Sequence, residues 1–274
     1  MNIITQSFIQ KQLIFIGFRQ IKFLIQRQRI KFSISQISMY LYAVFIHQSQ
    51  HKSFKNIYKN MNLTISYQAF MKNIVTLSPL IKFLFFYNNK KQNIKPSSLY
   101  NIVDTSLIPT KFPESIKQHD FNQHNVTTRV KNKIKVYICG IKLLVFINRF
   151  SKIYHAEILN INYSDQNILK SSALYESKLR GFLLADKGFN GKEAERRVNF
   201  SGKCKIISPK MKNSKIQLNE QEKRFYKKRW QIETVFQKLK NVYGDFKLDL
   251  KGAKNKKLIE AKLFSALMEF NLTT

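Results

Sequence analysis

The chain has 274 residues, of which 44% are hydrophobic and 13% aromatic, a composition that excludes a wholly disordered protein. Lys and Arg number 48 against 16 Asp and Glu, so the formal net charge is +32 and the expected partner is a polyanion. Nucleic acid is the first candidate, although charge alone does not separate DNA from RNA or from an anionic membrane surface. The two cysteines, Cys139 and Cys204, lack the paired spacing of a zinc or redox motif, which excludes a cysteine-based site of either kind.

The N-terminal part of the chain carries no acid at all. Residues 1–103 contain 14 Lys and Arg, and the first carboxylate is Asp104. Such a segment is either an arm that binds phosphate backbones or a stretch that is not read in its original frame, and both interpretations stay open. As a binding region it is equally compatible with a sequence-reading DNA-binding domain and with a nonspecific basic arm.

The same part of the chain predicts helices. Apolar residues recur at helical spacing over residues 8–37 and 57–86. Residues 88–98 are rich in lysine and serine and contain a proline, which predicts a linker. We therefore divide the chain into a basic, mainly helical N-terminal region that binds DNA, residues 1–95, and a second domain, residues 96–274.

Short apolar runs follow the linker, and such runs are typical of strands. The expected elements, in chain order, are a strand at 99–103 that ends on Asp104, a polar stretch at 110–133, a strand hairpin at 136–147 and 153–161, a helix at 165–178, a strand at 182–185 that ends on Asp186, a short helix at 192–198 and a strand at 204–207. Strands mixed with helices predict an α/β domain with a mixed sheet. We also expect Asp165 to cap the helix that follows it.

The last long element is predicted to be an amphipathic helix over residues 220–243. At about 100° per residue, its large apolar side chains fall on one broad face. Tyr226, Arg229, Glu233 and Lys240 fall in a stripe roughly 60° wide beside that face. One carboxylate therefore lies among cations at the margin of the core.

Three acids from separate elements, Asp104, Asp186 and Glu233, suggest one site for metal-dependent phosphodiester chemistry. Mg²⁺ requires hard oxygen ligands and uses few protein carboxylates per ion, which three acids around a pair of ions would satisfy. Such a pair of ions can assist both the attacking and the leaving oxygen of an in-line displacement. Each acid alone is more simply explained as a surface group or a cap.

Three blocks of sequence resemble the DDE transposases of bacterial insertion sequences. Residues 99–109, LYNIVDTSLIP, are similar to the strand that carries the family's first Asp, and residues 181–189, GFLLADKGF, to its second-Asp block. The third block is the most specific: Tyr226, Arg229, Glu233 and Lys240 reproduce the family's Tyr-Arg-Glu-Lys spacing. The resemblance spans residues 99–272.

This resemblance implies a fold and a set of roles. The fold would be a ribonuclease-H-like mixed sheet flanked by helices. Asp104, Asp186 and Glu233 would be both the catalytic residues and the ligands of Mg²⁺ or Mn²⁺. The residues expected to hold DNA are Tyr226, Arg229, Lys240 and Lys187.

The resemblance also implies a reaction and its partners. The phosphodiester at the end of the element is hydrolysed, and the freed 3′-hydroxyl then attacks target DNA. The partners would be transposon ends, target DNA and further copies of the chain in a synaptic complex. The sequence has neither a signal peptide nor an apolar run long enough to cross a bilayer, so we expect a cytoplasmic, nucleoid-associated protein without a membrane partner.

Two alternatives remain beside an active transposase. Relatives usually have His where Leu144 stands, and this departure, with the acid-free N-terminal segment, is compatible with a decayed copy that retains only DNA affinity. The other alternative is a ribonuclease-H-like nuclease, which would cut generic substrates without end specificity.

Overall fold

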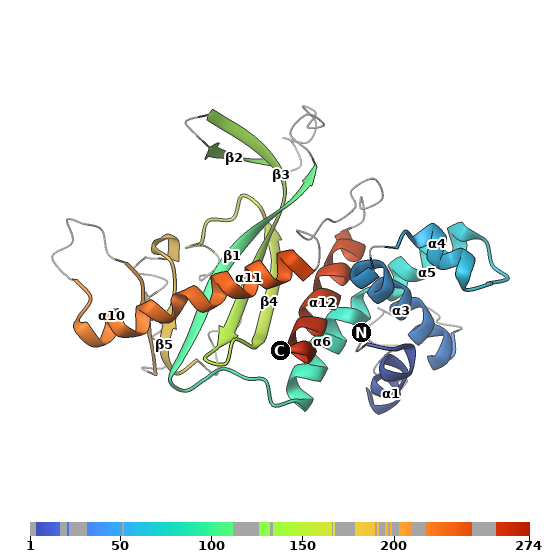
Figure 1. Cartoon of the computed structure of the whole chain (residues 1–274), viewed down its shortest axis with the longest axis horizontal. Coiled ribbons are helices and arrows are strands. Elements are labelled where there is room, and N and C mark those ends of the chain that lie inside the picture. Colours follow the sequence, from blue (N-terminus) through green and yellow to red (C-terminus); the bar gives the residue numbers. More distant parts are fainter. Residues whose placement is uncertain are drawn as a thin grey trace. The chain divides into compact units, whose positions relative to one another are not determined.

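The structure is a computed structural model (Figure 1). It describes residues 4–16, 21, 32–50, 52–111, 126–131, 134–165, 167, 179–189, 191, 195–196, 198, 203–209, 217–242 and 256–274. By its contacts the chain divides into two compact units, residues 1–92 with 239–274 and residues 93–238. The predicted boundary near residue 95 lies close to the change at residue 92, whereas the sequence-based division kept residues 239–274 with the second domain.

The first unit is built from helices around an aromatic and aliphatic core. Phe85 and Phe264 are fully buried, with ring centroids 5.4 Å apart. Its described helices are α1 (Gln6–Ile16), α3 (Ile34–Gln50), α4 (Phe54–Asn60), α5 (Tyr67–Leu77), α6 (Pro79–Lys91) and α12 (Lys256–Thr273). No single helix in the described ranges is long and apolar enough to span a membrane; α5 and α6, bent by 41° at their junction, meet the length and composition test only as a pair.

The helical stretch predicted over residues 57–86 is observed as parts of three helices, α4, α5 and α6, because local capping signals divide it. The Ser66 side chain accepts a hydrogen bond from the amide of Ala69 and begins α5, and Pro79 stands at the start of α6, where its missing N–H is not needed. Because α6 continues to Lys91, the predicted linker begins later than residue 88.

The second unit contains a six-stranded mixed sheet. Its strands are β1 (Tyr100–Lys111), β2 (Val126–Lys131), β3 (Ile134–Asn148), β4 (Ile153–Asn160), β5 (Gly181–Leu184) and β6 (Cys204–Ile207). The order is β2-β3-β1-β5-β6, with β4 also paired to β3; β5 runs parallel to β1 and β6, and the other pairs are antiparallel. Without β2, the order β4-β3-β1-β5-β6 is ribonuclease-H-like, so the predicted fold class is confirmed.

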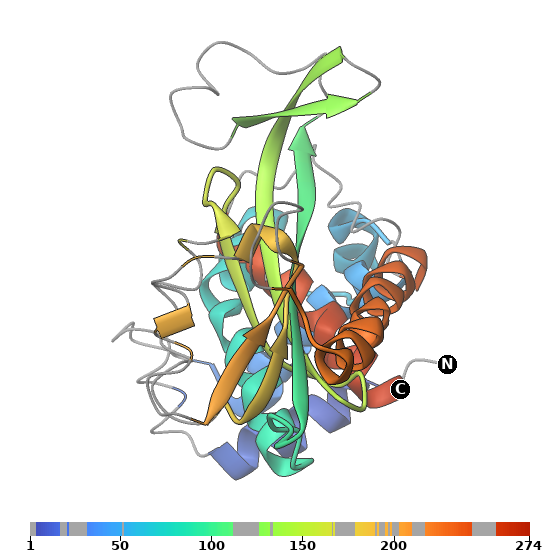
Figure 2. The same ribbon diagram turned by 90° about the vertical axis from the view of Figure 1, so that its left-hand side faces the viewer.

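The strand predicted to end on Asp104 continues for seven more residues. β1 pairs with β3 as far as Lys111, so Asp104 lies inside a strand and not at its end. The polar stretch predicted at 110–133 contains β2, which pairs with the first part of β3, and Figure 2 shows β2 and β3 projecting beyond the other strands. The part of this stretch that the structure describes between residues 112 and 133 is therefore a strand and not a loop.

The other strand predictions are confirmed. β3 and β4 form the expected antiparallel hairpin, and β5 and β6 fall at the expected positions. One face of the sheet is covered by a buried apolar cluster that includes Val103, Leu144, Phe146, Leu183, Ala185 and Phe189. Most of the helix predicted at 165–178 lies outside the described residues, as does most of the one at 192–198.

The late amphipathic helix is observed as three consecutive pieces. These are α10 (Glu220–Tyr226), the 3-10 turn η4 (Lys227–Arg229) and α11 (Trp230–Val242), and the predicted last residue, 243, is outside the described ranges. Asn219 and Glu222 form a reciprocal capping box at the start of α10. The Phe225 ring then packs against Tyr100 of β1 and Phe182 of β5, which fixes the helix onto the sheet.

Candidate active site

The strand register brings Asp104 and Asp186 to the same level of the sheet. In the parallel pair of β1 and β5, Tyr100 is opposite Phe182 and Ile102 is opposite Leu184. Continued for two more residues, past the end of β5, this register places Asp104 level with Asp186. Neighbouring strands are about 4.8 Å apart. Each carboxylate accepts a hydrogen bond from the next backbone amide, Thr105 and Lys187 respectively, at 2.8 Å.

Arg229 connects the first of these acids to the late helix. Its Nη2 donates to Asp104 Oδ2 at 2.7 Å, and its Nη1 donates to Glu233 Oε1 at 2.7 Å. The Arg229 and Asp104 side chains are 16% and 17% exposed, whereas Glu233 is 63% exposed, so one pair is shielded from solvent and the other is not. Figure 1 shows α11 crossing the sheet in front of β1, the arrangement that this bridge requires.

Tyr226 lies among the same charges. Burial raises the pKa of its phenol, the guanidinium of Arg229 lowers it, and the three carboxylates Asp186, Asp104 and Glu233 raise it further. The phenol therefore remains protonated at neutral pH and can act as a hydrogen-bond donor. Tyr226 therefore lies within electrostatic range of all three predicted acids.

Asp104 is the most perturbed carboxyl of the site. Burial raises its pKa to about 6, and the nearby carboxylates of Asp186 and Asp165 raise it as well. Arg229 and the Thr105 amide act in the opposite direction but do not compensate. Burial is the main cause of the raised pKa, and one guanidinium, that of Arg229, is shared by Asp104 and Glu233, so a further cation beside these carboxylates would be favourable.

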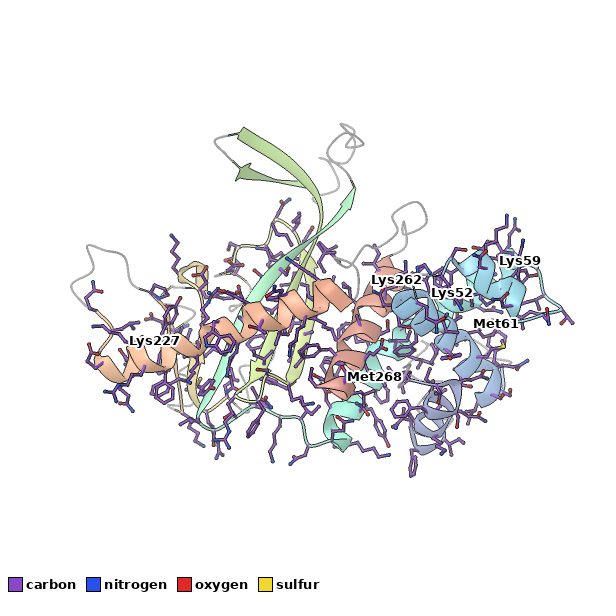
Figure 3. All side chains as sticks on the ribbon, viewed as in Figure 1. Lys52, Lys59, Met61, Lys227, Lys262 and Met268 are labelled. Atoms are coloured by element: carbon purple, nitrogen blue, oxygen red, sulfur yellow. The ribbon has the colours of Figure 1, made fainter. Side chains whose placement is uncertain are left out.

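The two predicted DNA-binding lysines are both exposed. Lys187 begins the 3-10 turn η3 (Lys187–Phe189) directly after Asp186, and Lys240 stands in the last turn of α11. Sequence reasoning did not select Lys227 and Lys228, which lie in the turn η4 beside Arg229 and are exposed; Figure 3 labels Lys227 at the junction of α10 and α11. The signal in the sequence that could have identified them is the run of three consecutive cations, Lys227, Lys228 and Arg229.

Asp165 was also missed as a member of the site. Its Oδ1 accepts from Thr105 Oγ1 at 3.3 Å and from Lys142 Nζ at 3.1 Å, so it contacts the sheet. Among the residues described at this turn, the capping bond predicted for Asp165 belongs to Ser164, whose Oγ accepts from the amide of Asn167. Asp165 therefore belongs to the surroundings of Asp104.

Leu144, where relatives usually have His, is fully buried and pairs with Thr105 across β1 and β3. Because side chains alternate along a strand, Leu144 faces the apolar cluster with Val103, while Asp104 and its partner Val145 face the other side. Leucine at this position extends the core, and its side chain is on the face of the sheet opposite to the Asp104 carboxylate.

The three acids fit a divalent ion by their chemistry, because all are hard carboxylate oxygens with excess negative charge. In the described ranges, however, no three His, Cys, Asp or Glu side chains are already grouped as metal ligands. The Arg229 guanidinium bridges Asp104 and Glu233 instead and stands in for a cation there. A metal ion bound by both acids would require Arg229 to take another partner, and its buried Nε has no hydrogen-bond partner at present.

Comparison with known proteins gives one family and two individual similarities. The family model described as "Transposase DDE domain" matches residues 100–244, which include all seven predicted site residues. "ISWI one complex protein 3" of Saccharomyces cerevisiae is 38% identical over 85 residues, which is 28% of this chain but only 11% of that protein. A cryo-EM structure of the piggyBac transposase synaptic complex with hairpin DNA has a TM-score of 0.45 and 10% identity, covering 96% of this chain and 72% of the other.

Proposed function

The chain belongs to the transposase DDE domain family, and from this premise we propose that it is a metal-dependent DNA transposase. The family match confirms the resemblance expected from the three sequence blocks. It extends from the first residue of β1 past the end of α11 and so contains each element that carries a predicted ligand. The observation that carries the proposal is the bridge from Arg229 to Asp104 and Glu233, close to the point where Asp186 follows the end of β5.

In this proposal Asp104, Asp186 and Glu233 hold the divalent ion, either Mg²⁺ or Mn²⁺. The bound ion supplies electrostatic stabilisation to the oxygens that attack and leave the phosphorus. The excess negative charge around Asp104 supports this role, because a cation would lower the free energy of the buried carboxylate. β1 and β5 fix the two Asp side chains through backbone pairing, whereas Glu233 reaches the site from α11.

The cationic side chains of the site would hold the DNA. Arg229 presents a planar fork of donors that suits a phosphate, and Tyr226 presents a neutral phenol beside it. Lys187, Lys227 and Lys228 are exposed, so each can neutralise a backbone phosphate without losing a structural contact of its side chain within the described residues. Lys240 extends the same charge along α11.

The proposed reaction cuts the phosphodiester at the end of the element and transfers its 3′-hydroxyl end to target DNA. Paired ends require more than one copy of the chain, so we propose a homo-oligomer in the DNA complex. The same proposal places the protein in the cytoplasm with the chromosome.

Cleavage of the DNA that flanks its gene tests the proposed function. The purified chain should cut that DNA at inverted repeats in Mg²⁺ or Mn²⁺ and not in EDTA. Asp186→Asn should reduce cleavage at least about 10³-fold while DNA affinity stays within about twofold, because an uncharged amide cannot hold the ion. Glu220→Gln, which removes an exposed carboxylate at the start of α10, is the matched control and should cut normally.

The other outcomes separate the alternatives. End-specific binding without cutting, in either metal, would identify a decayed copy. Cutting of unrelated DNA or RNA at the same rate would identify a nuclease. Undiminished cutting by Asp186→Asn would remove the proposed site altogether.

A further inference from the structure

Asp165 makes a set of contacts that the proposed roles do not explain. Its Oδ1 accepts two hydrogen bonds, from Thr105 Oγ1 on β1 and from Lys142 Nζ on β3. Thr105 is the residue after Asp104, and its backbone amide donates to the Asp104 carboxylate. One hydrogen bond that Asp165 accepts therefore comes from the residue whose amide orients the first predicted ligand.

The other oxygen of Asp165 lies against the turn that carries the second predicted ligand. A Cβ atom added to Gly188 would be 2.7 Å from Asp165 Oδ2 and 3.5 Å from its Cβ and Cγ. Gly188 is two residues after Asp186, in the turn η3, and its φ is not in the left-handed region. Its lack of a side chain is therefore explained by the close approach of Asp165 and not by backbone conformation.

Lys142 holds this arrangement in place. Its Nζ donates to Asp165 Oδ1 and also to the carbonyl oxygen of Tyr163 at 2.6 Å, so it binds the turn as well as the carboxylate. The Lys142 and Asp165 side chains are 12% and 26% exposed, so the pair is largely shielded from solvent. Since Oδ1 already accepts two hydrogen bonds and Oδ2 lies against Gly188, Asp165 is poorly placed to serve as a further metal ligand.

We propose that Asp165 is a positioning residue that fixes the Asp104 strand and the Asp186 turn relative to each other. Through Thr105 it acts on Asp104, and through Gly188 it acts on Asp186. The inference rests on the proposed function, because those two carboxylates are the ligands whose separation matters. Partners of this kind, which orient the ligands, typically change metal affinity or activity about 10- to 100-fold when mutated.

Metal affinity provides a readout that does not depend on turnover. Trp230 is the only tryptophan of the chain and stands three residues before Glu233, so it can sensitise the luminescence of bound Tb³⁺, a substitute for the divalent ion. Asp165→Asn should weaken Tb³⁺ and Mn²⁺ binding about 10-fold or more and reduce kcat for cleavage by a similar factor. DNA affinity should change less than about twofold.

Gly188→Ala disturbs the same contact between Gly188 and Asp165 by changing Gly188. The added methyl group displaces the Asp165 carboxylate, so this variant should show the same loss of metal affinity. The double variant should lose no more than the worse single variant, because both changes break one contact; independent structural effects would instead multiply. Asn167→Ala, at an exposed position two residues after Asp165, is the control and should bind metal like the wild type.

Unchanged metal affinity in folded Asp165→Asn would overturn the inference, as would multiplicative losses in the double variant. If Asp165→Asn does not fold, Thr105→Val tests the same hydrogen bond, because it removes only the hydroxyl that donates to Asp165. Normal metal affinity in Thr105→Val would count against the inference. A wild-type chain that binds no Tb³⁺ would refute the proposed function itself. Metal binding that is lost in Asp186→Asn but kept in Asp165→Asn would refute only the positioning role.

Discussion

At the scale of single residues, the site is an incompletely neutralised group of acids. Asp104 is buried and shares Arg229 with Glu233, and the single guanidinium cannot offset the carboxylates around it. Most folds avoid a buried carboxylate of raised pKa, because it costs stability at neutral pH. Its presence here is consistent with a binding site whose natural cation comes from solution.

Replacing Asp104 with Asn should stabilise the metal-free protein at neutral pH. The pKa of Asp104 is about 6 in the folded state and 3.8 for an unperturbed Asp, so the folded protein binds this proton more tightly and loses stability as pH rises from about 4 to 6. A shift of about two pKa units corresponds to about 3 kcal/mol, the upper bound of the gain. Urea denaturation of both proteins in EDTA from pH 4 to 8 measures the difference, which should be smallest at pH 4 and constant above pH 7.

Divalent metal provides the control for that prediction. Mn²⁺ should stabilise the wild type and have little effect on Asp104→Asn, because only the ionised carboxylate binds it. A variant that is less stable than the wild type at pH 8 in EDTA would mean that the hydrogen bond from Arg229 outweighs the burial of charge.

At the scale of elements, the site depends on how one helix is attached to a sheet. α10 packs Phe225 between Tyr100 and Phe182, and the 3-10 turn η4 follows before α11 presents Glu233. In a 3-10 turn each residue advances about 120°, not 100°, so the turn changes the face on which Arg229 and Glu233 lie. The stripe predicted for one continuous helix is therefore interrupted between Tyr226 and Arg229. The contacts of Phe225 with β1 and β5 nevertheless keep Tyr226 and Arg229 close to the sheet.

The start of α10 should be sensitive to its capping box. Asn219→Ala removes the acceptor of the hydrogen bond that the Glu222 amide donates to the Asn219 side chain, and should lower the free energy of unfolding by about 1 kcal/mol. Asn219→Ser, which can still cap, should restore most of that loss. Thermal melting of the three proteins in the same buffer measures both effects, and equal melting temperatures would show that the box contributes nothing to stability.

At the scale of the whole molecule, charge and organisation point to a long polyanion. The net charge of +32 is spread over both compact units, and the helical unit contains exposed lysines such as Lys52 and Lys59, labelled in Figure 3. Residues from the two ends of the chain, including α12, combine to build that unit. The catalytic unit is consequently inserted between the two segments of the helical one.

DNA binding should depend steeply on salt. A protein that neutralises roughly 6 to 10 phosphates loses about 10³- to 10⁵-fold in affinity between 50 and 200 mM salt. Trp230 is 59% exposed beside Arg229, so its fluorescence should change when DNA occupies the site and can follow the titration. Affinity that is flat over this range would exclude an electrostatic interface, and fluorescence that stays constant while DNA binds would place the DNA away from α11.

The sequence by itself determined the acids, their family and the class of fold. Motif spacing identified Asp104, Asp186, Tyr226, Arg229 and Glu233, and short apolar runs predicted β3, β4, β5 and β6, because these signals are local. The roles of these residues stay predictions until they are tested.

Only the tertiary structure decided what depends on contacts between distant segments. Pairing with β3 extends β1 beyond Asp104, the register with β5 brings Asp186 to the same level, and Arg229 joins two acids 129 residues apart in the sequence. The contacts of Asp165 with Thr105 and Gly188 belong to the same class. Hydrogen bonding and packing across a sheet set these distances, and no periodicity within one segment records them.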